Sequence, residues 1–128
     1  MTGGQQLALD QLQAVADASN GAFELLGHRV NPGGDTVVAE IALRCMELPR
    51  MAGGIPLRAR EEFLIGVGTS FPFHHPTVQT RHARFAGFPH VQWNKVLCLY
   101  VAPEVEWTVS DGMFGFVTRL WEWLTAAA

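Results

Sequence analysis

The chain has 128 residues, of which 48% are hydrophobic and 16% are charged, and its formal net charge is −3. This length fits one domain, and the apolar content is enough for a core and excludes the composition of a disordered chain. Nine Lys and Arg residues against twelve Asp and Glu residues leave no basic stripe for phosphates, so we expect no nucleic-acid partner.

The N-terminal stretch has two parts. Residues 1–6, Met1 to Gln6, resemble part of a phage-derived epitope tag, and we interpret them as a tag remnant that precedes a single domain at residues 7–128. Apolar residues then recur at helical spacing as far as a Gly stop signal, which predicts an amphipathic helix at residues 7–19. No basic residue precedes Arg29 and no apolar run has the length of a membrane span, so we expect neither a secretory signal nor a membrane partner.

Period-two alternation and turn residues predict four strands in the next section of the chain. They are expected at residues 22–30, 36–45, about 60–68 and about 77–81. The second strand shows the pattern best, because Val37, Ala39, Ile41 and Leu43 share one face. Residues 82–96 have no sustained period and are predicted to form an ordered loop in which Phe85, Phe88 and Trp93 are buried.

The last element is a predicted helix that begins after Ser110. Ser110 is expected to cap it with Asp111 in its first turn, and its buried stripe is expected to be Phe114, Val117, Leu120, Trp121 and Leu124. The helix reaches Ala128 without a stop signal, which suggests a piece excised from a longer chain. Strands and helices are segregated along the chain, so we predict an α+β fold whose antiparallel sheet is covered by helices on one side.

The two cysteines differ in the face on which they fall. In an extended Leu97-Cys98-Leu99 segment the leucines point to the core and the Cys98 thiol points outward. Cys45 has the parity of the buried face of the second strand, so it is expected to be buried and inert. Without a signal peptide, both thiols are expected to be reduced and the protein cytoplasmic.

Four motifs in order resemble the ubiquitin-conjugating enzymes over residues 7–125. Phe71 to Val78 looks like the family's YPF-x-x-P-x-V run, and Pro89-His90 stands near its His-Pro-Asn segment. Leu97-Cys98-Leu99 looks like its active-site I-C-L, and Trp107 follows nine residues after the cysteine. Residues 85–90, 106–107 and 111–116 resemble bacterial members, which are often fused to or encoded beside a ThiF-like adenylating enzyme.

The resemblance implies a fold and a reaction. The fold would be that of the ubiquitin-conjugating enzymes, and Cys98 would hold a ubiquitin-like protein as a thioester and pass it to an amine. The implied partners are the ubiquitin-like protein, a ThiF-like activating enzyme and a target protein amine, with no cofactor. Antiphage defence is the setting that the resemblance suggests.

Several residues are candidates to support Cys98. The family's Asn after His-Pro is absent, and either His90 or Asn94 could replace it as a hydrogen-bond donor. We favour His90 as the oxyanion donor, although its imidazole could equally well only hold the loop. By position, Trp107, Glu106 and Asp111 are further supporting residues, and the two carboxylates could orient an incoming lysine or simply lie on the surface.

Two other functions and a metal site are alternatives to the carrier role. The four histidines upstream of Cys98 are irregularly spaced, so no metal is expected. A non-catalytic module that recruits a ubiquitin-like protein or an adenylating partner would use the same fold without an acyl intermediate. A cysteine hydrolase would need a contact between a histidine and Cys98.

Overall fold

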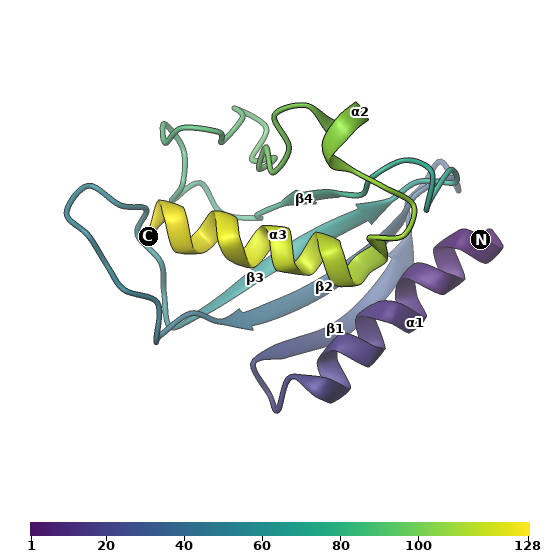
Figure 1. Cartoon of the computed structure of the whole chain (residues 1–128), viewed down its shortest axis with the longest axis horizontal. Coiled ribbons are helices and arrows are strands. Elements are labelled where there is room, and N and C mark those ends of the chain that lie inside the picture. Colours follow the sequence, from purple (N-terminus) through teal and green to yellow (C-terminus); the bar gives the residue numbers. More distant parts are fainter.

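The computed structural model describes residues 1–128 and has the predicted order of elements. Its helices and strands are α1 (Gly3–Ala18), β1 (Phe23–Val30), β2 (Val37–Arg44), β3 (Arg60–Val67), β4 (Thr77–Gln79), α2 (Pro103–Glu106) and α3 (Gly112–Ala127). The four strands form one antiparallel sheet in the order β1-β2-β3-β4, and α1 and α3 lie on the same face of it (Figure 1). The predicted α+β fold is therefore confirmed. None of the helices combines the length and the apolar character needed to cross a membrane.

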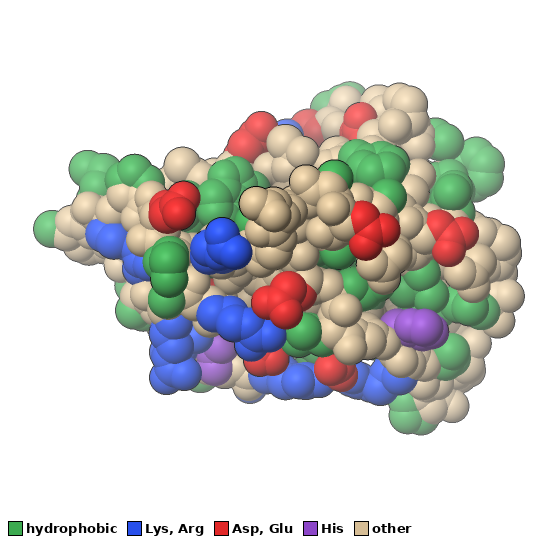
Figure 2. Space-filling model, turned by 90° about the horizontal axis from the view of Figure 1, so that it is seen from below, with side chains coloured by type: hydrophobic (Ala, Val, Ile, Leu, Met, Phe, Trp, Pro, Cys, Tyr) green, Lys and Arg blue, Asp and Glu red, His purple; other side chains and the backbone are tan.

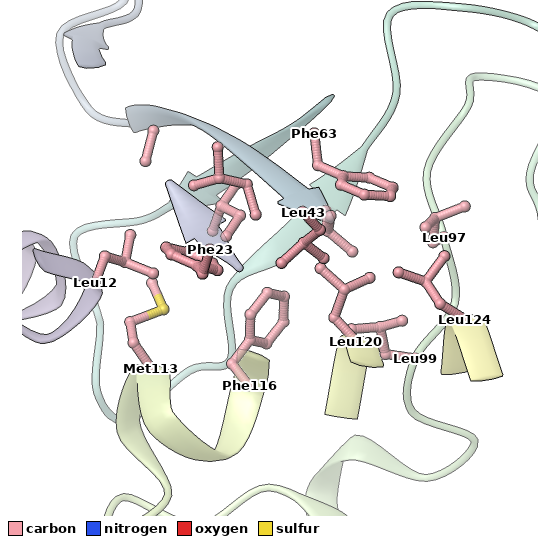
Figure 3. Close-up of a cluster of buried hydrophobic side chains, with 14 of the residues drawn as sticks. Leu12, Phe23, Leu43, Phe63, Leu97, Leu99, Met113, Phe116, Leu120 and Leu124 are labelled. Carbon is pink, nitrogen blue, oxygen red and sulfur yellow. The ribbon is translucent and has the colours of Figure 1, made fainter. Parts of the chain in front are cut away.

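The core lies between the sheet and the two long helices. Alternate residues of β2 and β3 point into it, and pairs such as Ile41–Phe63 lie directly opposite each other in the sheet. The four residues predicted for the inner face of β2 are at most 4% exposed. Side chains of β1–β3, α1, α3 and the segment around Leu97 and Leu99 meet in one cluster (Figure 3).

Helix α3 turns only part of the predicted face to the core. Leu120 and Leu124 are buried as predicted, and Val117 packs partly buried against the core. Phe114 is 51% exposed and Trp121 is 38% exposed, and Met113 and Phe116 are buried in their place. The start of the helix explains the difference, because Ser110 does not cap it. The backbone N–H of Met113 instead donates to Oε1 of Gln11 in α1 over 2.8 Å. The contact between the two helices thus fixes the rotation of α3.

The first residues of the chain belong to the packed fold. Helix α1 begins at Gly3 rather than at residue 7, with Thr2 and Gln5 forming a reciprocal capping box. Gln5 is 2% exposed, and its side-chain amide donates to the carbonyl oxygens of Asp35 and Val67 over 2.9 and 3.0 Å. The N-terminal turn of α1 is therefore tied to the ends of β2 and β3.

The loop at residues 82–96 is ordered and is held at both ends. Phe85 is 1% exposed and Phe88 is half-buried, as predicted, but Trp93 is 96% exposed, so the prediction that it is buried is wrong. The reason is a tight turn, in which Gln92 and Lys95 are joined by a backbone hydrogen bond and Lys95 has a φ of 71°. The turn carries the indole of Trp93 away from the core.

Candidate functional site

Cys98 lies on a short extended segment against the 82–96 loop and β4. Its backbone N–H donates to the carbonyl oxygen of His90 over 2.8 Å, and that of Leu97 donates to the carbonyl oxygen of Val78 over 2.9 Å. Leu97 and Leu99 are 4% and 7% exposed, whereas Cys98 is partly exposed. The predicted alternation around Cys98 is confirmed, and it directs the thiol away from the core.

Cys45 has the opposite environment. It is fully buried after β2, and its Sγ lies 3.7 Å from the carbonyl oxygen of Leu43. Burial raises the pKa of the Cys45 thiol to about 11, and the negative charge of Glu61 acts in the same direction. The two cysteines are not bonded to each other, and of the two only Cys98 is accessible.

A glutamine that the sequence analysis did not single out contacts the Cys98 thiol. The side-chain Nε2 of Gln92 donates to Sγ of Cys98 over 3.2 Å. Val91 and Leu97 form an antiparallel bridge, so Gln92 is a diagonal neighbour of Cys98 across a short hairpin. A hairpin predicted around a turn at Asn94-Lys95 would have placed Gln92 beside Cys98 from the sequence alone.

The thiol opens into a hollow of about 410 Å³ between β4, the hairpin and α3. Twelve residues line this thiol hollow: His75, Pro76, Thr77, Val78, Gln92, Val96, Leu97, Cys98, Leu99, Tyr100, Pro103 and Phe116. No Asp, Glu, Lys or Arg is among them. Burial raises the pKa of the Tyr100 hydroxyl to about 12, so this phenol is neutral at physiological pH.

The two predicted oxyanion donors make different contacts. His90 is exposed, has a left-handed φ of 64°, and holds Cys98 through its carbonyl oxygen, while its imidazole makes no hydrogen bond. His90 lines a second hollow, of about 420 Å³, and not the one that contains Cys98. Asn94 lies in the turn, where its side-chain oxygen accepts from the N–H of Val96 over 3.3 Å.

The three other predicted supporting residues organise the segment that follows Cys98. Trp107 is 8% exposed, and its indole N–H donates to the carbonyl oxygen of Pro72 over 3.0 Å. A carboxylate oxygen of Glu106 accepts from the N–H of Ala102 over 2.5 Å, and the other pairs with Arg119. Hydrogen bonds from the backbone at Ala102 and from Arg119 lower the pKa of Glu106.

Asp111 acts in a similar way, since its carboxylate accepts from the N–H of Thr108 over 3.0 Å. Glu106 and Asp111 line an acidic hollow together with Tyr100, Phe114, Gly115, Thr118, Arg119 and Glu122. Tyr100 is the residue that this acidic hollow shares with the thiol hollow. The predicted carboxylates therefore line a different hollow from the one that contains Cys98.

A buried ion pair, which the sequence analysis missed, anchors the beginning of the 82–96 loop. Glu61 is 1% exposed and accepts two hydrogen bonds from Arg84, over 2.5 and 2.9 Å, and one from the N–H of Arg58 over 2.8 Å. Burial alone would raise the pKa of Glu61, but the bonds from Arg84 and Arg58 outweigh it and lower that pKa. Basic and acidic side chains also alternate along the lower edge of the surface in Figure 2.

No three His, Cys, Asp or Glu side chains come together as metal ligands would.

A family model described as prokaryotic E2 family A matches residues 11–128. Comparisons with curated proteins and with solved structures gave no match. The match covers α1 from residue 11 onward, the four strands, α3 and the segment that carries Cys98.

Proposed function

Because the chain belongs to prokaryotic E2 family A, we propose that it carries a ubiquitin-like modifier as a thioester on Cys98 and passes it to an amine. A role in ubiquitin-like conjugation follows from the family. The carrier role rests on one observation: Cys98 is the accessible thiol of the chain, and it opens into a hollow with an amide donor on its sulfur. A ThiF-like activating enzyme, a modifier and a target amine are the partners that this proposal requires, in the cytoplasm and in a setting such as antiphage defence.

The proposed reaction consists of two acyl transfers. In the first, Sγ of Cys98 attacks the thioester carbonyl on the activating enzyme, a new C–S bond forms, and the activating enzyme's thiolate leaves. In the second, a target amine attacks the Cys98 thioester, the amide bond forms, and Cys98 departs as the thiolate while the amine loses a proton. Both steps pass through a tetrahedral oxyanion, which preorganised N–H donors stabilise.

The contacts around the sulfur suggest a role for each neighbouring residue. The amide of Gln92 is the donor nearest to the sulfur, so we assign it to the oxyanion. His90 contributes through its carbonyl, which holds the backbone of Cys98, and Asn94 through the turn that positions Gln92. Trp107, Glu106 and Asp111 hold the chain segment after Cys98 in place.

The non-catalytic binding module is the alternative. It would need neither an accessible thiol nor a donor on it, and the contact between Gln92 and Cys98 therefore supports the carrier role. The hydrolase alternative would need an imidazole bonded to the thiol, and no histidine nitrogen makes that bond.

The test is a loading reaction with the cognate activating enzyme, ATP and the modifier. The native chain and Cys45→Ala should form an adduct that a reducing agent removes, and Cys98→Ala should form none. An adduct that survives in Cys98→Ala would contradict the proposal, and so would a native chain that forms no adduct.

A further inference from the structure

A basic hollow of about 260 Å³ lies where β3 begins and β4 has just ended, and it shares no residue with the thiol hollow. Only polar side chains line it: Arg58, Arg60, Glu61, Glu62, Arg81, His82 and Arg84. Four of the nine Lys and Arg residues of the chain therefore meet at one concave site. Arginine suits the recognition of carboxylates, because its planar guanidinium can donate two parallel hydrogen bonds.

The surroundings of the basic hollow are also positive. Arg44 lies directly opposite Arg60 in the sheet, and Nζ of Lys95 donates to the carbonyl oxygen of Arg81 over 3.0 Å. Six of the nine Lys and Arg residues thus gather here, against four of the twelve Asp and Glu residues, two that line the hollow and two that pair with its arginines. The basic hollow is therefore a positive region of a chain whose net charge is negative.

Two nitrogen atoms at the basic hollow have no acceptor. Nδ1 of His82 accepts from the backbone N–H of Arg84 over 3.2 Å, so the ring proton is on Nε2. Burial and the charge of Arg84 lower the pKa of His82, so the ring is neutral at pH 7. Nε2 of His82 and Nε of Arg84 are the buried side-chain polar atoms of the chain without a hydrogen-bond partner. Unpaired buried donors add to the positive potential, which favours an anion nearby.

We propose that the basic hollow binds an acidic segment of a partner protein, whose Asp or Glu carboxylates pair with its arginines. Two of the guanidiniums already lie beside Glu61 and Glu62, so carboxylates of the chain interrupt the positive charge. Such a pattern fits carboxylates spaced along a peptide better than the continuous phosphates of a nucleic acid. Complementary charges of this kind steer association and select partners. The docking role is independent of the acyl chemistry proposed for Cys98.

Arg58 is the arginine most available to an acidic segment. Its side chain is exposed and makes no ion pair within the chain, whereas Arg60, Arg81 and Arg84 each pair with a glutamate. The hydrogen bond from Arg58 to Glu61 comes from the backbone N–H, so a change of the Arg58 side chain preserves it. Substitution of Arg58 therefore removes a contact to the partner and leaves the fold intact.

A fluorescent peptide tests the proposal without an identified partner. The probe is Gly-Glu-Glu-Glu-Glu-Gly with blocked ends, and the comparison peptide has Gln in place of each Glu. Both are titrated with the full chain at low ionic strength, and fluorescence anisotropy gives the Kd. We expect the Glu peptide to bind at least about tenfold more tightly than the Gln peptide, and its affinity to fall as salt is added.

A pair of variants shows whether the basic hollow is the binding site. Arg58→Gln should weaken binding of the Glu peptide about tenfold, because it removes a charge-assisted contact. Arg44→Gln is the matched control, since Arg44 is also exposed and makes no ion pair but does not line the hollow. It removes the same charge and should cost less than about threefold. Amide chemical shifts should change at Arg58 and at residues 81–84 when the Glu peptide binds.

Three results would overturn the proposal. The first is equal affinity for the Glu and Gln peptides. The second is a loss in Arg58→Gln no larger than the loss in Arg44→Gln. The third is tighter binding of a single-stranded DNA oligomer with the same number of charges, which would identify the region as a phosphate-binding surface instead.

Discussion

The side-chain amide of Gln92 donates a hydrogen bond to the Sγ atom of Cys98 over 3.2 Å. The contact joins the two arms of a hairpin whose turn is closed by a backbone bond between Lys95 and Gln92. A carbonyl carbon bonded to this sulfur would carry its oxygen within reach of the same N–H group. Under the proposed function, the hairpin would provide the donor that the family's missing Asn would otherwise supply.

Removing this donor should slow acyl transfer without unfolding the chain. Gln92 is exposed, so we expect Gln92→Ala to leave the stability unchanged and to lower the rates of loading and discharge by about 10²-fold. Gln92→Glu keeps the shape but loses the donor, and its negative charge beside the thiolate should lower both rates at least as much. Single-turnover discharge to free lysine measures the effect. Trp93→Ala is the control, because Trp93 lies in the same turn and is 96% exposed, and an equal loss in that variant would show that the turn matters rather than the amide.

The role of His90 can be separated into its backbone and its imidazole. Its φ of 64° is a left-handed conformation that Asn and Gly adopt readily, so His90→Asn and His90→Gly should keep the carbonyl bond to Cys98. We expect both variants to retain loading rates within about threefold of the native rate, well below the effect of an oxyanion donor. A hundredfold loss in both would instead identify the imidazole as the catalytic group.

Alkylation with iodoacetamide should distinguish the two thiols. Cys98 is partly exposed and should react in the native protein, whereas Cys45 is fully buried and its pKa is raised to about 11. Cys45 should therefore stay unmodified from pH 7 to pH 9, because the reagent cannot reach its thiol and the thiol stays protonated. It should react only after denaturation. Mass spectrometry of the intact chain counts the labels. Two labels on the folded protein would contradict this assignment.

The ion pair between Arg84 and Glu61 should make the stability depend on pH. Because the pKa of Glu61 is lowered from its ordinary 4.5 in the folded state, its contribution is complete above that value and is lost as the pH falls below it. Arg84→Met leaves the carboxylate buried and unpaired, which should cost about 3 kcal/mol at pH 7.

Urea unfolding at a series of pH values measures both effects. The difference between native and Arg84→Met should shrink as the pH falls, because without Arg84 the buried carboxylate of Glu61 takes up its proton at a higher pH than in the native chain. Arg29→Met breaks an exposed pair with Glu40 and serves as the control, with an expected cost below about 1 kcal/mol. A cost for Arg84→Met that equals that of Arg29→Met would show that the buried pair contributes little.

Local periodicity correctly predicted which side chains of an extended segment are buried, because this depends only on residues close together in the sequence. Alternation along β2 gave the correct inner face, and the same reasoning placed Leu97 and Leu99 inside and Cys98 outside. In both cases side chains two positions apart in an extended chain must share a face. The geometry of an extended chain was therefore sufficient for these two predictions.

Apart from Trp93, which a local turn exposes, the incorrect predictions and the missed residues depend on contacts between parts of the chain that meet only in the fold. Ser110 was expected to cap α3, but Gln11 binds the first turn from 102 positions away, and Met113 and Phe116 are buried where Phe114 and Trp121 were expected. Arg84 and Glu61 are 23 positions apart, and neither residue alone indicated a buried pair. Gln92 was missed because its importance lies in a hairpin diagonal, which exists only once the turn at Asn94 and Lys95 has formed.

The carrier role can be tested directly by locating the acyl group after loading. The native chain is incubated with activating enzyme, ATP and modifier, digested at mildly acidic pH without reductant, and mapped by mass spectrometry. We expect the C-terminal residue of the modifier on the peptide that contains Cys98, and its release by hydroxylamine. Modification on another residue, or an unmodified Cys98 in a reaction that consumes ATP, would contradict the account.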